Sequence, residues 1–199
     1  MSVVVGVQHN GVVYVGADSQ STGGSGDQYT RLDKKIFLSC GYIMGVVGSS
    51  RIAQLLKTAT NIPQLPATLK SATESELDGT KLFEVEKFFV TKFVPHLKQL
   101  FTDFGTDNDA EDSSDILVAV GPWMVVIESD YQVGFYADKY IAIGSGDGPS
   151  LGSLASTESV DPEQRLHLAL QASAKHSNTV SAPFYMFVTS GGRQKKLPK

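Results

Sequence analysis

The sequence has little cysteine: Cys40 is the only one among 199 residues. A single cysteine excludes a disulfide within the chain and fits a reducing compartment, so we expect a cytoplasmic protein. Cys40 ends the apolar run Ile36–Cys40. In such a run a thiol that packs as a small apolar residue is favoured over a nucleophile.

The chain also lacks long apolar runs and an excess of positive charge. No apolar stretch reaches the ~18 residues that a membrane span needs, and no basic start precedes an apolar segment as in a secretory signal. The net charge of −4 and the pI near 5.5 argue against a nucleic-acid partner, which calls for a basic surface. We therefore expect neither a membrane nor a nucleic acid as partner.

Spacings typical of metal sites are absent as well. The histidines are scattered along the chain, at His9, His96, His167 and His176. The Asp103–Asp115 stretch is rich in carboxylates, but it lacks the EF-hand spacing, so a solvated loop is favoured over a calcium site. We assign no metal and no cofactor.

What is present is the composition of one globular domain. Hydrophobic residues make up 41% of the chain and charged residues 19%, with no internal repeat. We expect a domain over residues 1–190. Residues 191–199 read as a basic tail without an apolar anchor, which we expect to fray.

The first 35 residues organise the chain. The Val3–Val7 run predicts a strand, and Asn10-Gly11 between two β-branched runs predicts a hairpin with a second strand that reaches Ser19. Ser2 then lies at the tip of this hairpin, and only Met1 precedes it, so we expect no presequence. Ser19–Thr30 is polar and glycine-rich, which fits an active-site loop or a plain surface loop.

The rest of the chain alternates between strand and helix patterns. Strands are predicted at residues 36–40, 42–47, 116–120, 123–127, 132–136, 140–143 and 183–188. Helices are predicted at residues 51–59, 81–101 with a kink at Pro95, 149–155, and from Asp161-Pro162 to His176. This order suits an α+β fold in which two antiparallel sheets pack together with helices outside both, a four-layer αββα sandwich.

A serine close to the chain start has a special chemistry available to it. If Ser2 becomes the first residue, its hydroxyl is a nucleophile and its own neutral amine can take the proton. An α-amine titrates near pH ~8, and a neighbouring lysine cation disfavours its protonated form. Such a site needs a cation, a carboxylate that holds the cation, and backbone N–H donors for an oxyanion. Asp18 and Lys35 are residues of the right types.

These residues stand in a pattern that resembles the β-type proteasome subunits. The matching stretches are Ser2–Val7, Gly16-Ala17-Asp18-Ser19, Lys35-Ile36, Gly45–Ser50 and Ile143-Gly144-Ser145-Gly146, in the same order and at similar spacing. The resemblance extends to the bacterial heat-shock-locus peptidase and the Anbu type, and covers roughly residues 2–189. It implies the N-terminal-nucleophile hydrolase fold.

The resemblance also implies a role for each matching residue. Ser2 would be the nucleophile, Asp18 would hold Lys35, and Ser145 would lie near the terminal amine. The backbone N–H of Ser49, or less favourably Gly48, would form the oxyanion hole, while the substrate would be bound by Ser21, Thr22, Val47 and Arg51. From Val47 and Arg51 we expect cleavage after medium apolar or acidic residues. Lys34 is the alternative to Lys35 as the catalytic lysine. Counting residues from Ser2 without a gap selects Lys34, whereas the Lys-Ile pair of the family selects Lys35 and needs one inserted residue in the glycine-rich loop. We favour Lys35, since loop insertions cost little.

The sequence departs from the family pattern at two places. Serine replaces the usual threonine, which keeps the hydroxyl but loses the methyl group that restricts its rotamer. The family also has an aspartate after the last long helix, where this chain has Lys175 and no acid nearby. Ser177 and Asn178 are the local candidates to hydrogen-bond the terminal amine instead, as in the Anbu pattern.

Three functions follow as alternatives. The first is an N-terminal-serine endopeptidase that acts on polypeptides after Met1 is removed. The second is an inactive scaffold subunit of the same fold, and the third is another amide hydrolase, because fold does not fix function. The resemblance also implies a homo-oligomeric ring or spiral and an ATPase unfoldase as partner.

Overall fold

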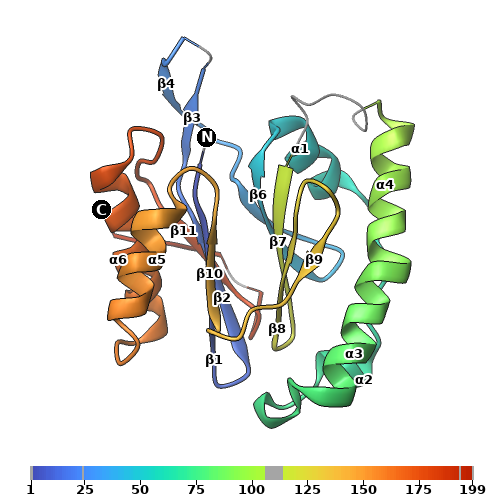
Figure 1. The fold of residues 1–199 in the computed structure, drawn as a ribbon. Coiled ribbons are helices and arrows are strands. Elements are labelled where there is room, and N and C mark those ends of the chain that lie inside the picture. Colours follow the sequence, from blue (N-terminus) through green and yellow to red (C-terminus); the bar gives the residue numbers. More distant parts are fainter. Residues whose placement is uncertain (1, 24, 106–113, 193, 199) are drawn as a thin grey trace.

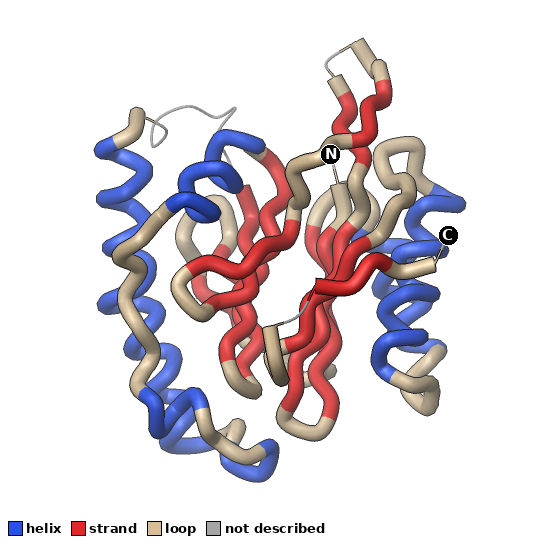
Figure 2. Tube along the Cα trace, turned by 180° about the vertical axis from the view of Figure 1, so that it is seen from behind, coloured by secondary structure: helices blue, strands red, loops and turns tan. Residues whose placement is uncertain are grey.

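The computed structural model describes residues 2–23, 25–105, 114–192 and 194–198. Two antiparallel sheets lie face to face in the centre, and helices cover the outer face of each (Figure 1). The view from behind shows the same four layers, with strands between two groups of helices (Figure 2). The predicted αββα sandwich is therefore confirmed. None of the helices in the described ranges is long and apolar enough to cross a membrane.

The first sheet has the order β10-β1-β2-β11-β12, with all neighbours antiparallel. Its strands are β1 (Val4–His9), β2 (Val12–Ala17), β10 (Tyr140–Ile143), β11 (Tyr185–Val188) and β12 (Gln194–Lys196). The β1–β2 hairpin turns at Asn10 and Gly11, which have φ of 49° and 72°. Positive φ at both central residues is what a tight hairpin turn requires, so the Asn-Gly prediction is confirmed.

The second sheet has the order β5-β6-β7-β8-β9. Its strands are β5 (Ile36–Ser39), β6 (Tyr42–Gly48), β7 (Ser114–Val120), β8 (Trp123–Ile127) and β9 (Val133–Gly134). β9 is shorter than the strand predicted at residues 132–136. Val133 pairs with Ile127 and Gly134 with Val126, and no further pairs follow in the described ladder.

Each outer face has its own helices. α5 (Asp147–Ser156) and α6 (Pro162–His176) cover the first sheet. The second is covered by α1 (Ser50–Thr58) and by a long helix made of α3 (Gly79–Phe88), the π-helical turn η2 (Phe89–Phe93) and α4 (Val94–Asp103). The short α2 (Ala67–Lys70) and η1 (Glu74–Glu76) connect α1 to α3.

The long helix was predicted with a kink at Pro95. The irregularity lies just before it, in the π-helical turn η2. Pro95 stands in the first turn of α4, where a residue without a backbone N–H is tolerated. A π-helical turn relaxes the normal hydrogen-bond ladder, so the helix passes the proline without ending.

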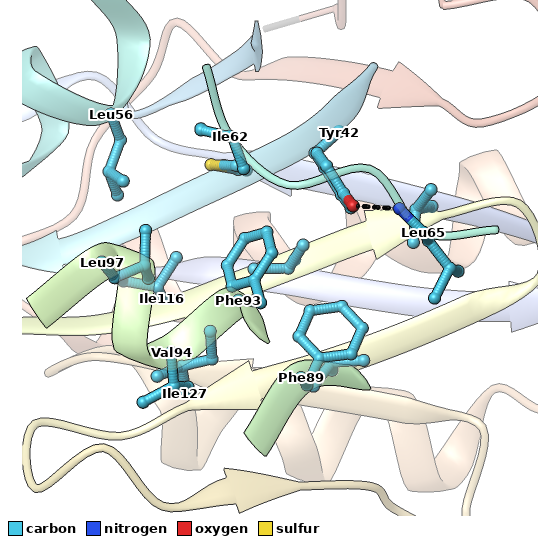
Figure 3. Packing of buried hydrophobic residues seen from close by; sticks show 14 of the residues in the cluster. Tyr42, Leu56, Ile62, Leu65, Phe89, Phe93, Val94, Leu97, Ile116 and Ile127 are labelled. Carbon is cyan, nitrogen blue, oxygen red and sulfur yellow. Dashed lines mark hydrogen bonds between the residues drawn. The ribbon is translucent and has the colours of Figure 1, made fainter. Parts of the chain in front are cut away.

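The buried residues form three layers. One lies between the two sheets, one between the second sheet and its helices, and one between the first sheet and α5–α6. Figure 3 shows the helix side of the second sheet, where Phe89 and Phe93 pack near Tyr42. The hydroxyl of Tyr42 donates to the Pro63 carbonyl and accepts from the Leu65 N–H, each at 2.7 Å, which ties the segment after α1 to this core.

The sheets can approach closely because a glycine faces Val4. A Cβ on Gly45 would lie 2.4 Å from a methyl group of Val4, closer than packed atoms allow. β1 thus sits directly against β6, and the residues at the end of β6 come near the start of β1. This contact helps to position the site described below.

Two expectations from the sequence are wrong. The polar segment 19–30 is not only a loop, because β3 (Gln20–Thr22) and β4 (Gln28–Thr30) form a hairpin that projects beyond the sandwich (Figure 1). Residues 194–196 are not a free tail, because they form β12 on β11. The physical reason is Leu197, which is only 5% exposed and whose N–H donates to the Phe184 carbonyl at 3.0 Å. Leu197 is the apolar anchor that the sequence reading missed.

Candidate active site

Ser2 lies immediately before β1 and is 7% exposed. Its backbone nitrogen donates to Ser145 Oγ at 3.1 Å, and its carbonyl accepts from the Gly146 N–H at 3.2 Å. Gly144 allows this close approach: its φ is +98°, and a Cβ there would lie 2.5 Å from the Ser2 carbonyl oxygen. The predicted Gly144-Ser145-Gly146 motif is therefore hydrogen-bonded to both the nitrogen and the carbonyl of Ser2. Met1 lies outside the described residues.

Asp18 stands at the end of β2, where the β1–β2 register brings it beside Val3. Its carboxylate is buried and accepts hydrogen bonds from the Val3 N–H at 3.1 Å and the Gln20 N–H at 2.8 Å. Lys35 Nζ lies 2.6 Å from the same carboxylate. The Ser181 N–H also points to it, at 3.5 Å. Asp18 thus fixes the residue after Ser2 and the lysine together.

The structure pairs Lys35, and not Lys34, with Asp18. The Lys35 side chain is 10% exposed, and this burial lowers its pKa, while the Asp18 charge opposes the shift. Lys34 Nζ instead donates to Gln194 and lies over the Tyr185 ring, 4.2 Å from its centroid.

A chain of hydroxyls continues from Ser145. Ser145 Oγ lies 2.8 Å from Thr179 Oγ1, which lies 2.7 Å from Ser177 Oγ. Ser177 is therefore linked to the Ser2 nitrogen through Thr179 and Ser145. Thr179 is 4% exposed and was not predicted from the sequence. The Asn178 carbonyl accepts hydrogen bonds from Gln20 and Gln28, so that residue holds the β3–β4 hairpin.

The predicted oxyanion donor has a partner of its own. The Ser49 N–H donates to Ser114 Oγ at 2.9 Å, and Ser49 Oγ caps α1 by accepting from the Arg51 N–H. Ser114 was not predicted; it comes into place because Gly48 pairs with it across β6 and β7. Gly48 has φ of +102°, which favours glycine there.

Ser2 lines two cavities. The first, of about 120 Å³, is lined by Ser21 and Thr22, two of the residues predicted to bind substrate, together with Arg31 and Lys35. The second, of about 260 Å³, is lined by Ser2, Val47, Gly48, Ser114, Asp115, Ser129, Gly144 and Ser145.

Two predicted substrate-binding residues, Val47 and Arg51, do not line the first cavity. Val46 lines the first cavity and Val47 the second, because successive side chains on a strand point to opposite faces. Arg51 lines a different cavity, of about 620 Å³, between α1 and α4. Val47 thus lines a cavity beside Ser2, whereas Arg51 lines neither of the two cavities there, and the substrate-binding roles of both residues stay predictions.

Acidic residues at positions 107, 109, 111 and 112 lie outside the described residues, so the predicted loop is not seen there. Among the residues that are described, no group of three or more metal-binding side chains comes together.

No protein-family model and no curated protein matches the sequence. Solved structures do match the fold. BPH from Thiobacillus denitrificans, in a complex with epoxomicin, has a TM-score of 0.68 and 19% identity over 94% of this chain and 97% of that one. For HslV from Trypanosoma brucei the TM-score is 0.61 at 16% identity, over 94% of this chain and 98% of that one.

An Anbu mutant from Hyphomicrobium sp. strain MC1 has a TM-score of 0.65 at 10% identity, over 98% of this chain and 86% of that one. Matches of this kind span nearly the full length of both chains, and at these identities they establish the fold. The chain therefore has the fold of the proteasome β-like N-terminal-nucleophile hydrolases.

Proposed function

We propose that this chain is the subunit of a proteasome-like endopeptidase, with Ser2 as its N-terminal nucleophile once Met1 has been removed. The observation that carries the proposal is that three predicted residues come together beside Ser2. Ser145 Oγ lies 3.1 Å from the Ser2 nitrogen, and Asp18, which binds Lys35, accepts a hydrogen bond from the N–H of the next residue, Val3. With Met1 attached, the Ser2 nitrogen is an amide and cannot act as a base. Removal of Met1 turns the same nitrogen into an amine.

In this mechanism the Ser2 hydroxyl attacks the peptide carbonyl while the amine accepts its proton. The amine then gives the proton to the leaving nitrogen, and water releases the acyl group from Ser2 by the reverse sequence. Lys35 lines the same cavity as Ser2, and its positive charge disfavours protonation of the amine. Asp18 keeps that lysine in place.

The hydroxyl chain Ser145–Thr179–Ser177 takes the place of the family aspartate near Lys175. Ser145 can accept a hydrogen bond from the amine of Ser2 and pass polarisation on to Thr179. A neutral chain stabilises a protonated amine less than a carboxylate does. We therefore expect the amine to lose its proton more readily than in a site with the aspartate.

A second candidate function is an inactive scaffold subunit, and one contact favours it. The Ser49 N–H that would stabilise the oxyanion donates to Ser114 Oγ at 2.9 Å. For catalysis this donor must leave Ser114 or be shared, and one oxyanion donor contributes roughly 10²–10³ in kcat. If Ser114 holds the donor, Ser114→Ala should raise the cleavage rate; in a scaffold subunit it changes nothing.

The proposal is tested with protein whose intact mass shows that Met1 is absent. Such protein should cleave fluorogenic peptides and gain the mass of epoxomicin, the compound in the BPH complex. Ser2→Ala should lose both properties, Lys35→Ala nearly so, and Lys34→Ala neither. Quantitative retention of Met1 in protein from the native host contradicts the mechanism and leaves the scaffold function.

We further propose a homo-oligomeric ring or open spiral, served by an ATPase unfoldase in the cytoplasm. The fold neighbours include HslV and Anbu proteins, and a sequestered site would spare folded proteins. Native mass spectrometry should find about a dozen or more copies. A monomer at micromolar concentration contradicts this assembly.

A further inference from the structure

The first cavity beside Ser2 is lined by more cations than carboxylates, although the whole chain carries a net charge of −4. Its described lining contains three cations, Arg31, Lys34 and Lys35, and one carboxylate, Asp33. Lys35 is neutralised from behind by Asp18, and Lys34 is directed to Gln194 and Tyr185. Arg31 also has a counterion, Asp33, but its guanidinium has more N–H donors than its contacts with Asp33 and Ser50 use, so it is the cation best placed to meet a bound carboxylate.

Arg31 is held in position by two neighbours. Its guanidinium forms a two-point ion pair with Asp33 and donates to Ser50 Oγ at 2.8 Å. Asp33 takes two of its N–H groups and Ser50 one, and a guanidinium has further donors beyond these. A carboxylate in the cavity can use them in the planar geometry that arginine offers to acids.

The rest of the lining disfavours other side chains. Apolar contact comes only from Val46 and Ala53 among the described lining residues, and the cavity is small, at about 120 Å³. A large apolar side chain would bury little apolar area there and would desolvate Arg31. A basic side chain would meet like charges.

We propose that this cavity selects an acidic side chain on the residue that precedes the scissile bond, and that Arg31 determines the selection. This inference rests on the proposed peptidase function and names its substrate class. Sequence reasoning looked for the positive charge at Arg51. We assign that role to Arg31, because the β3–β4 pairing returns the chain to the end of β2, where the Arg31 N–H donates to the Ser19 carbonyl at 3.0 Å and its side chain lines the cavity.

The first test compares peptides that differ only at the residue before the cut. Protein with Ser2 as its first residue should cleave after Glu about tenfold faster in kcat/KM than after Gln, a difference of about 1.4 kcal/mol. Cleavage after Arg should be slower still. Arg31→Gln should remove the preference for Glu. Arg51→Gln makes the same chemical change outside this cavity and should preserve it.

A second measurement separates this inference from the peptidase proposal. In the Ser2→Ala variant, fluorescence polarisation follows the binding of peptides that end in Glu or in Gln. We expect about tenfold tighter binding of the Glu peptide, lost in Ser2→Ala/Arg31→Gln. Equal binding, or a preference that survives Arg31→Gln, overturns the inference even if peptides are cut. If nothing is cut, the peptidase function fails and the binding comparison still decides the selectivity of the cavity.

Discussion

Asp18 and Lys35 contact each other, but replacing Asp18 should lower the free energy of unfolding more than replacing Lys35. Asp18→Asn leaves the Lys35 ammonium 10% exposed without its counterion, and breaking a buried pair in this way costs about 3–5 kcal/mol. Lys35→Met leaves Asp18 with the Val3 and Gln20 N–H donors. Only one charged hydrogen bond is then lost, which costs about 1.5–3 kcal/mol.

The double variant Asp18→Asn/Lys35→Met removes both charges. We expect it to be less destabilised than the sum of the single variants by about 2 kcal/mol, because no buried charge remains unpaired. Urea unfolding at constant m-value measures all four free energies of unfolding. Lys34→Met serves as the control, since Lys34 does not contact Asp18; its cost should stay below about 1 kcal/mol.

Two results would refute this reasoning. The first is equal destabilisation by Asp18→Asn and Lys35→Met with a coupling below about 0.5 kcal/mol, which means that the pair does not interact as the geometry indicates. The second is a Lys34→Met variant as unstable as Lys35→Met, which means that the wrong lysine has been placed beside Asp18.

Three further predictions concern other parts of the fold. Tyr42→Phe should lower the free energy of unfolding by about 1–3 kcal/mol, because the Leu65 N–H and Pro63 carbonyl lose their partner. Burial raises the pKa of Tyr42 to about 12, whereas an unfolded tyrosine ionises near pH ~10. The contribution of Tyr42 to the free energy of unfolding is therefore complete below pH ~10 and lost toward pH ~12. Denaturation at a series of pH values should show the difference in free energy of unfolding between wild type and Tyr42→Phe narrowing over this range. Gly144→Ala should abolish peptide cleavage and lower the free energy of unfolding by about 1–3 kcal/mol, because the added Cβ meets the Ser2 carbonyl at a residue with positive φ. The control is Gly148→Ala in α5, which has open space around it and should leave cleavage and stability unchanged or slightly improved. Leu197→Ala should lower the melting temperature and expose residues 194–198 to hydrogen exchange, and Leu32→Ala, at a site that is 98% exposed, should do neither.

The parts of the fold that could be predicted have local signals. Asn10-Gly11 between valine runs specifies the first hairpin, and Asp161-Pro162 specifies the start of α6, where Asp161 accepts from the Glu163 and Gln164 N–H groups. Ser2, Asp18, Lys35 and Ser145 could be named because they stand in ordered motifs. The structure brings all four together, although their chemistry stays a proposal.

The parts that were missed depend on long-range pairing. Ser114 reaches Ser49 only through the β6–β7 register, and Thr179 reaches Ser145 across 34 residues of chain. Neither has a distinctive local pattern. Arg31 was overlooked because the segment before it was read as a loop, and a loop gives no direction to its side chains. Leu197 was overlooked because one leucine among lysines shows no periodicity.

The way the backbone of Ser2 is held has a consequence for biosynthesis. Ser2 emerges from the ribosome near the beginning of translation. Three of the residues that contact it or Asp18 arrive much later, namely Ser145, Gly146 and Ser181. β10, which flanks β1 in the sheet, also belongs to this late part. A nascent chain therefore carries the proposed nucleophile, Ser2, for most of translation without the hydrogen bonds from Ser145 and Gly146. If Ser2 acts as proposed, its reactivity would depend on completion of the polypeptide as well as on removal of Met1.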